Sequence, residues 1–143
     1  MSTTATATVQ VSRRLPATPE QVYDAWLDPA HAEQWLFRTP DGSLERCEID
    51  ARVGGGFRID ERRGEDIAEH HGEYVEIDRP RLLAFDFWTS FSDERTRVTV
   101  AIAPDGAGSL LTLTHEGVWD GWQEKTRQGW TMILDHLAQA LTE

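Results

Sequence analysis

The sequence predicts an α+β fold in which an antiparallel sheet packs against one long helix at the C-terminal end. Two observations support this prediction. From Gly121 to Leu141, apolar residues recur every three or four positions, which is the pattern of a helix with one buried face. Between residues 44 and 116, short alternating segments are separated by turn residues, which is typical of an antiparallel meander. We expect the 143 residues to form a single domain, 1–143.

The composition indicates an acidic, soluble domain with a packed core. The chain has 14 Lys and Arg against 25 Asp and Glu, so its formal net charge is −11, which disfavours nucleic acid and anionic membranes as partners. Hydrophobic residues make up 39% of the chain, but no apolar run approaches the roughly 20 residues of a membrane span. Residues 1–8 lack the basic start and apolar block of a secretory signal. With only one cysteine, Cys47, we expect a cytoplasmic protein without an internal disulfide.

The N-terminal quarter predicts one strand and two short helices. Thr6–Leu15 alternates as a strand does, and Pro16 ends it. Thr18 is a suitable N-cap for the first helix because Pro19 follows at the first helical position. A second short helix is predicted over Ala30–Trp35, capped by Asp28, and residues 36–44 are predicted to form a loop.

Six further strands are predicted before the long helix. In one of them, Gly72, Tyr74 and Glu76 are expected on one face, opposite His71, Val75 and Ile77. The glycines at positions 54–56 lack the Lys-Ser/Thr of a phosphate-binding loop and predict a strand junction. The charged run 60–69 predicts a solvated hairpin tip. The strands are predicted over Leu44–Val53, Phe57–Asp60, Ile67–Ile77, Leu82–Trp88, Thr96–Ala103 and Leu110–Glu116.

An ordered set of short motifs runs along the chain: RLPATPEQVYDAW at 14–26, Asp28-Pro29, Trp35, GGGF at 54–57, HGEY at 71–74, Pro80, Leu83, LTHE at 113–116, Gly129-Trp130, Leu134 and Leu137. The set resembles the bacterial proteins related to the C-terminal domain of the activator of Hsp90 ATPase, which belong to the START-like (SRPBCC) superfamily together with polyketide cyclases and the Bet v 1 allergens. The resemblance covers Val9 to Leu141. It implies the helix-grip fold, in which a curved antiparallel sheet of about seven strands, with two short helices, grips the long C-terminal helix around a cavity. It implies no particular reaction.

Large rings near the open end of such a cavity would line a ligand pocket. The first half of the long helix is expected to form one wall of the pocket, while Leu134, Leu137, Ala138 and Leu141 pack on the sheet. The alternative for each aromatic residue is that it simply fills the core. The candidate ligand-binding residues are Trp35, Phe37, Phe57, Ile59, Tyr74, Phe85, Phe87, His115, Trp122, Thr126, Trp130 and Ile133.

Two histidine sites raise the question of metal binding and acid–base chemistry. His70 and His71 are neighbours in a strand, so they point to opposite faces and cannot chelate one ion together. His71 and Glu73 share a face but supply only two ligands, so we expect a half-exposed pair and no metal. His115 beside a pocket is a candidate acid–base group, although a histidine hydrogen-bonded at a strand end is the favoured interpretation. We predict no catalytic residue and no cofactor.

Three functions therefore remain open. The preferred one is a protein that binds an apolar or aromatic small molecule without catalysis. The second is a cavity enzyme, such as a cyclase, aromatase or hydrolase that uses His115 or Tyr74. The third is a protein-interaction module acting on a chaperone or as a homodimer, in which Trp119 and Trp122 form the exposed surface rather than a lid over the pocket.

Overall fold

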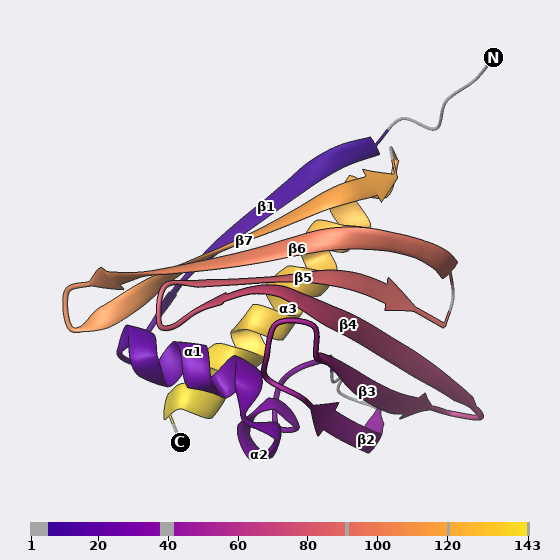
Figure 1. Cartoon of the computed structure of the whole chain (residues 1–143), viewed down its shortest axis with the longest axis horizontal. Helices are drawn as coiled ribbons and strands as arrows, with labels where there is room; N and C mark the ends of the chain where they lie inside the picture. Colours follow the sequence, from indigo (N-terminus) through magenta and orange to yellow (C-terminus); the bar gives the residue numbers. More distant parts are fainter. Residues whose placement is uncertain (1–5, 38–41, 91, 120, 143) are drawn as a thin grey trace.

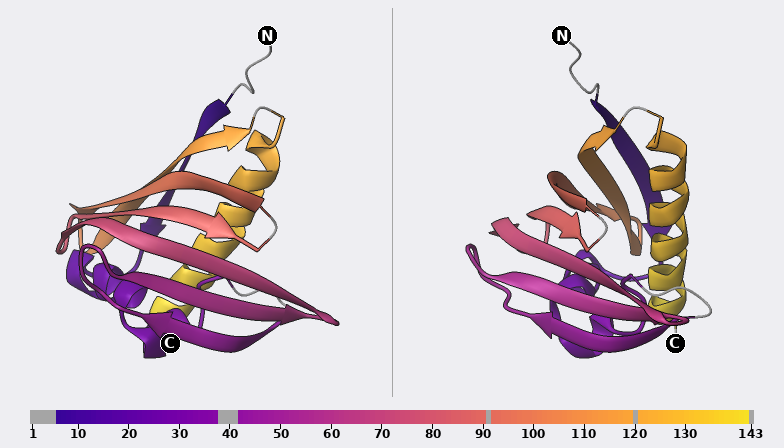
Figure 2. Two further views of the ribbon diagram at one scale, coloured as in Figure 1. Left: turned by 45° about the vertical axis from the view of Figure 1, so that its right-hand side comes forward. Right: turned by 90° about the vertical axis from the view of Figure 1, so that its right-hand side faces the viewer.

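Seven antiparallel strands form one sheet, and the long C-terminal helix packs along one face of it (Figures 1 and 2). The computed structural model describes residues 6–37, 42–90, 92–119 and 121–142. The strand order is β1-β7-β6-β5-β4-β3-β2. This confirms the predicted fold class. The elements are β1 (Thr6–Leu15), α1 (Pro19–Leu27), α2 (Pro29–Ala32), β2 (Ser43–Ile49), β3 (Gly56–Arg63), β4 (Asp66–Asp78), β5 (Leu82–Thr89), β6 (Ser92–Asp105), β7 (Gly108–Trp119) and α3 (Gln123–Thr142).

The two short helices begin as the sequence predicts. Thr18 forms a capping box with Gln21, because each side chain accepts a hydrogen bond from the backbone N–H of the other. The Asp28 side chain caps α2 by accepting from the N–H of Ala30 at 3.0 Å. The second helix is shorter than predicted and ends at Ala32. Turns follow it, and they carry Trp35 into the core, where its indole N–H donates to Ala25 O at 3.2 Å.

The core lies between the inner face of the sheet and one side of α3. Leu111 and Leu113 on β7 and Leu134 and Leu137 on α3 are fully buried. Burial of such side chains supplies most of the stabilisation of a domain of this size, at about 25 cal/mol per Å² of apolar surface. The second half of α3 therefore packs on the sheet, as expected.

A β-bulge changes the predicted orientation of residues near the end of β4. Tyr74 pairs with Phe85, but Glu76 rather than Val75 pairs with Ala84, so Val75 is an extra residue in the ladder. After Val75, the alternation of inward-facing and outward-facing side chains along β4 is therefore shifted by one residue. Ile77 consequently packs against the core on the side of Tyr74, and the predicted faces of Glu76 and Ile77 are wrong.

The charged run 60–69 is a solvated hairpin tip only in its middle part, because residues 62–66 are exposed but Asp60 and Glu61 are buried. Strand β3 continues to Arg63 and β4 starts at Asp66, so only residues 64 and 65 form the turn. Glu61 shares the inner face with Ile59 and is fully buried, while Asp60 is buried on the other face. The Glu61 carboxylate is paired with Arg63 Nε at 2.6 Å. Because the prediction relied on charge alone, it missed the strand alternation that continues through these residues.

Gly72 on β4 allows close approach of an aromatic ring. A Cβ atom at this position would overlap the Phe57 ring, which lies across the Gly72 backbone from the neighbouring strand. The Phe57 ring is in turn stacked on Phe37, with centroids 5.8 Å apart. This glycine is thus required by packing rather than by its backbone angles.

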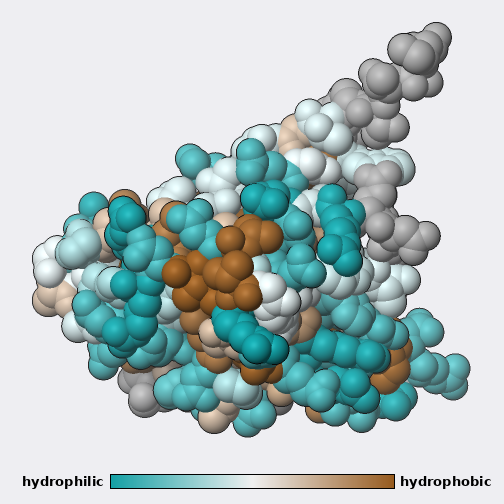
Figure 3. Space-filling view, in the orientation of Figure 1, coloured by the Kyte–Doolittle hydropathy of each residue, from teal (hydrophilic) through white to brown (hydrophobic). Residues whose placement is uncertain are grey.

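Most of the surface seen in the orientation of Figure 1 is hydrophilic, with a large hydrophobic area near the centre of the view and a smaller one at the lower right (Figure 3). This agrees with the strongly acidic composition. None of the helices in the described ranges is long and apolar enough to cross a membrane.

Candidate functional site

A groove with a volume of about 500 Å³ lies where the ends of three strands meet the start of α3. Strands β5 and β7 end there and β6 begins there, so side chains from three neighbouring strands converge on it. Most of the lining is apolar, with threonine and histidine side chains on the walls. The lining residues are Phe87, Trp88, Thr89, Thr96, His115, Gly117, Val118, Trp119, Trp122 and Thr126.

Two exposed tryptophans stand at the rim of this groove. Trp119 is 43% exposed and Trp122 is 53% exposed, although both are large apolar side chains. The backbone N–H of Trp122 donates to Trp119 O at 3.0 Å, and Trp122 O accepts from Thr126 N, so a tight turn leads directly into the helix. The ammonium group of Lys125 lies 4.8 Å from the centroid of the Trp122 ring. Large exposed rings of this kind mark a binding surface.

A chain of hydrogen bonds forms the polar part of the groove wall. Trp130 Nε1 donates to His115 Nδ1 at 3.0 Å, and His115 Nε2 lies 2.7 Å from Thr96 Oγ1. Thr96 Oγ1 also donates to Phe87 O at 3.3 Å. Burial lowers the pKa of His115 to about 4, so the ring is neutral near pH 7.

The arrangement does not favour His115 as an acid–base catalyst. An indole N–H can only donate, so His115 Nδ1 must be the nitrogen with the lone pair. That lone pair is occupied by Trp130, and the N–H on Nε2 points to Thr96. This is the geometry of a histidine held by hydrogen bonds at a strand end.

The predicted ligand-binding residues separate into two groups. Four of them, Phe87, His115, Trp122 and Thr126, line the groove. The other eight are buried in one contiguous core cluster, and which of the twelve contact a ligand stays a prediction. The eight core residues are Trp35, Phe37, Phe57, Ile59, Tyr74, Phe85, Trp130 and Ile133.

The core group is held together by ring contacts. The Phe37 ring lies 5.3 Å from Phe87 and 5.7 Å from Trp130, measured between centroids. Phe57 meets Phe85 edge to face at 5.1 Å. These distances are in the range of favourable aromatic pairs. Phe87 belongs to both groups, because it touches the aromatic core and also lines the groove.

Several groove residues were not predicted from the sequence: Trp88, Thr89, Thr96, Gly117 and Val118. One of them could have been found from the hairpin that joins β6 and β7. Its turn at residues 106–107 sets Asp105 opposite Gly108, and the same register sets Arg97 opposite Glu116. Continuing it by one residue places Thr96 beside Gly117, next to His115. Thr96 could thus have been predicted as a neighbour of His115 by counting the strand register from the hairpin turn.

The two adjacent histidines on β4 have different surroundings. His70 is buried and donates from Nδ1 to Ile59 O at 3.2 Å, so the prediction of a half-exposed pair is wrong for this residue. Its ring stacks on Phe37 with centroids 4.4 Å apart. Burial lowers the pKa of His70 to about 4. His70 is inward-facing because it alternates with Gly72 and Tyr74 on the inner side of β4.

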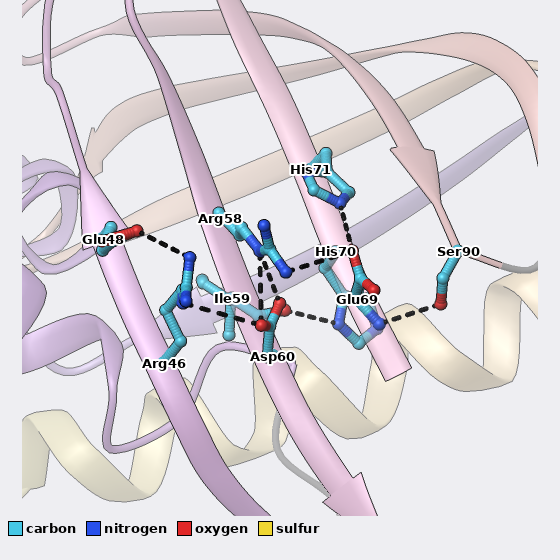
Figure 4. Close-up of polar contacts among 9 residues, drawn as sticks. All are labelled: Arg46, Glu48, Arg58, Ile59, Asp60, Glu69, His70, His71 and Ser90. Carbon is cyan, nitrogen blue, oxygen red and sulfur yellow. Dashed lines mark hydrogen bonds and ion pairs between the residues drawn. The ribbon is translucent and has the colours of Figure 1, made fainter. Parts of the chain in front are cut away.

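On the opposite face, His71 belongs to a network of charged side chains (Figure 4). His71 Nε2 lies 3.0 Å from Glu69 Oε1, which is also 3.3 Å from a guanidinium nitrogen of Arg58. Arg58 Nε in turn contacts Asp60 at 3.1 Å. Since each carboxylate here has an arginine partner, the network resembles a surface of ion pairs. Within the described ranges, no three His, Cys, Asp or Glu residues are placed to hold a metal ion.

Cys47 has no features of a reactive thiol. It is partly buried, and its Sγ lies 3.8 Å from Pro29 O. Burial raises the pKa of the Cys47 thiol to about 11, so the nucleophilic thiolate is scarce at neutral pH.

Comparison with solved structures identifies the same architecture in several bacterial proteins. A protein of Chromobacterium violaceum superposes with a TM-score of 0.85 at 27% sequence identity, covering 95% of this chain and 98% of that one. An NMR structure described as an AHSA1-like protein from Aeromonas hydrophila has a TM-score of 0.84 at 21% identity, over 95% of this chain and 92% of that one. A protein of Rhizobium loti has a TM-score of 0.81 at 23% identity, over 98% of this chain and the whole of its own.

No curated protein shows a significant sequence match to the chain. The sequence profile described as "Activator of Hsp90 ATPase homolog 1-like protein" matches residues 16–142, from the end of β1 to the last residues of α3. The match includes every element that surrounds the groove and the aromatic core. The chain therefore belongs to the activator of Hsp90 ATPase homolog 1-like family of the START-like (SRPBCC) superfamily.

Proposed function

We propose that this protein binds a neutral, flat apolar or aromatic small molecule in the groove between the strand ends and the start of α3. The observation that carries the proposal is the pair of exposed tryptophans, Trp119 and Trp122, at the rim of a groove of about 500 Å³. A volume of this size fits a small organic ligand. The ligand would displace water from the apolar walls, and hydrogen bonds to the threonine hydroxyls would orient it. The fold of the family, with its space between sheet and helix, agrees with this function.

The proposal makes no use of catalysis. Both ring nitrogens of His115 are hydrogen-bonded within the protein, and the Cys47 thiol is protonated at neutral pH. The groove thus supplies shape, apolar surface and hydrogen bonds. Binding alone is the function that these properties support best.

A fluorescence titration with N-phenyl-1-naphthylamine, a neutral apolar probe, tests the proposal. We expect saturable binding with energy transfer from the rim tryptophans, and a decrease in affinity of about tenfold in Trp122→Ala, because truncating a large aromatic ring removes a contact of the kind that dominates many binding surfaces. Val53→Ala is the matched control, because Val53 is an apolar side chain 63% exposed that does not line the groove. Equal affinity in Trp122→Ala and the parent protein, or no saturable binding in the parent, would contradict the proposal.

The same tryptophans favour a second candidate, a homodimer interface. Two adjacent exposed indole rings are the kind of surface that a second copy of the chain would cover. Sedimentation over a range of concentrations distinguishes the two candidates. A dimer that dissociates in Trp122→Ala supports the interface, whereas a monomer at every concentration removes this candidate and leaves the ligand groove unaffected.

A further inference from the structure

The hydrogen bonds along the groove wall run in one direction. Trp130 can only donate, so His115 accepts at Nδ1 and the neutral ring carries its proton on Nε2. His115 Nε2 therefore donates to Thr96 Oγ1 over 2.7 Å. The Thr96 hydroxyl proton is then directed to Phe87 O, a carbonyl that can only accept. The indole N–H of Trp130 at one end and the carbonyl of Phe87 at the other therefore fix the direction of all three hydrogen bonds.

The direction of these hydrogen bonds determines whether the Thr96 hydroxyl can donate a hydrogen bond to a ligand or accept one from it. A hydroxyl group has one proton and two lone pairs. In Thr96 the proton is used on Phe87 O and one lone pair is used by His115, so one lone pair is left. Thr96 is partly exposed and lines the groove. At this point of the wall the protein accepts a hydrogen bond and has no proton to donate.

We infer that the ligand of the groove carries a hydroxyl or N–H group that donates a hydrogen bond to Thr96 Oγ1, as a phenol does. The inference rests on the proposed function and narrows its class of ligand. A carboxylate or carbonyl oxygen placed here meets the lone pair of Thr96 and is repelled. The formal net charge of −11 further disfavours an anionic ligand.

The direction of these hydrogen bonds stays the same over the ordinary range of pH. Burial lowers the pKa of His115 to about 4, so the ring keeps its lone pair on Nδ1 from pH 5 upward. A second proton on the ring would point directly at the N–H of Trp130. The preference for a ligand that donates a hydrogen bond thus follows from the way in which β5, β6, β7 and α3 place Phe87, Thr96, His115 and Trp130 next to one another.

The test compares 2-naphthol with its methyl ether, which has the same ring system but no proton to donate. Both are titrated against the parent protein, Thr96→Val and Thr96→Ser by tryptophan fluorescence quenching. In the parent protein we expect 2-naphthol to bind about five- to tenfold more tightly than the ether, the usual value of one neutral hydrogen bond. The preference is expected to disappear in Thr96→Val, which keeps the shape but cannot accept, and to persist in Thr96→Ser.

The outcomes separate this inference from the proposed function. If neither compound binds the parent protein, the proposed function fails. If both bind with equal affinity, or if Thr96→Val keeps the preference, the groove binds apolar rings but the inference is wrong. Thr96→Val leaves the His115 N–H without its partner, so circular dichroism must first show that the variant is folded. If Thr96→Val is not folded, the inference is tested by the parent protein and Thr96→Ser alone. Both must bind 2-naphthol more tightly than its methyl ether, and equal affinities would contradict the inference.

Discussion

Replacing His115 by Asn is expected to remove a large part of the acid sensitivity of this protein. The Asn side chain can still present an oxygen to the Trp130 N–H, but it does not titrate. In the parent protein, burial lowers the pKa of His115 from the ordinary 6.5 to about 4. Between these two values the unfolded chain binds a proton that the folded chain does not. Stability from this residue is therefore fully present above pH 6.5 and is lost as the pH falls toward 4.

The size of the effect follows from the two pKa values. Between pH 7 and pH 5, one such histidine lowers the free energy of unfolding by about 2 kcal/mol. His70 has a pKa lowered to about 4 by burial as well, so the two residues together account for a loss of about 4 kcal/mol in the parent protein. His115→Asn should lose about half as much, because only His70 is left. A domain of this kind has a total stability of about 5–15 kcal/mol, so the difference is large.

Urea unfolding followed by tryptophan fluorescence at pH 7, 6 and 5 measures the effect. The readout is the slope of the unfolding free energy against pH rather than its absolute value, because Asn fills less of the buried site than the imidazole ring does. The carboxylates contribute equally to both proteins and cancel in the comparison. Gln128→Asn, which introduces Asn at an exposed position without removing a titratable group, is the control and should keep the slope of the parent protein. If His115→Asn and the parent protein show parallel slopes, the buried neutral histidine described above is refuted.

Three further contacts are tested by substitution and urea unfolding at pH 7. Trp130→Phe removes the donor to His115 Nδ1 and should lower the unfolding free energy by about 1–3 kcal/mol, and an unchanged value would contradict the hydrogen bond. Gly72→Ala forces a Cβ into the Phe57 ring and should cost about 1–3 kcal/mol, whereas Gly129→Ala, in open space within α3, should stabilise by about 1 kcal/mol; equal effects of the two would refute the packing argument. Ser109→Ala removes a buried hydrogen bond to Ala17 O, 2.6 Å long, and should cost about 1–2 kcal/mol, with an effect near zero as the opposing result.

The order of the secondary structure elements was predictable because each has a strong local signal. The Thr18 cap and the periodicity of α3 depend only on neighbouring residues, and both are present in the structure. The bulge at Val75 has no such signal in one strand alone, since it depends on the pairing of β4 with β5. The second short helix ends early because Trp35 turns into the core, which is a tertiary effect.

The candidate site was only partly predictable for a related reason. The aromatic character of the interior can be read from the sequence, but whether a given ring packs against others or faces a groove depends on three-dimensional placement. Trp130 and Trp122 lie on the same predicted stripe, yet Trp130 is buried and Trp122 is more than half exposed. The partners of His115 come from β6 and α3, which are distant in sequence.

The position of the groove at the very start of α3 has a consequence for how this protein can change over time. The residues that stabilise the fold, such as Leu134 and Leu137, lie about three to four turns further along the same helix. The rim residues Trp119 and Trp122 contribute little to the buried core, because both are largely exposed. Substitutions at the rim can thus alter which molecule is recognised with little loss of stability. In the proposed function, ligand choice depends on the junction between β7 and α3, whereas folding depends on the later turns of α3, so a scaffold of this kind is suited to diversification by mutation.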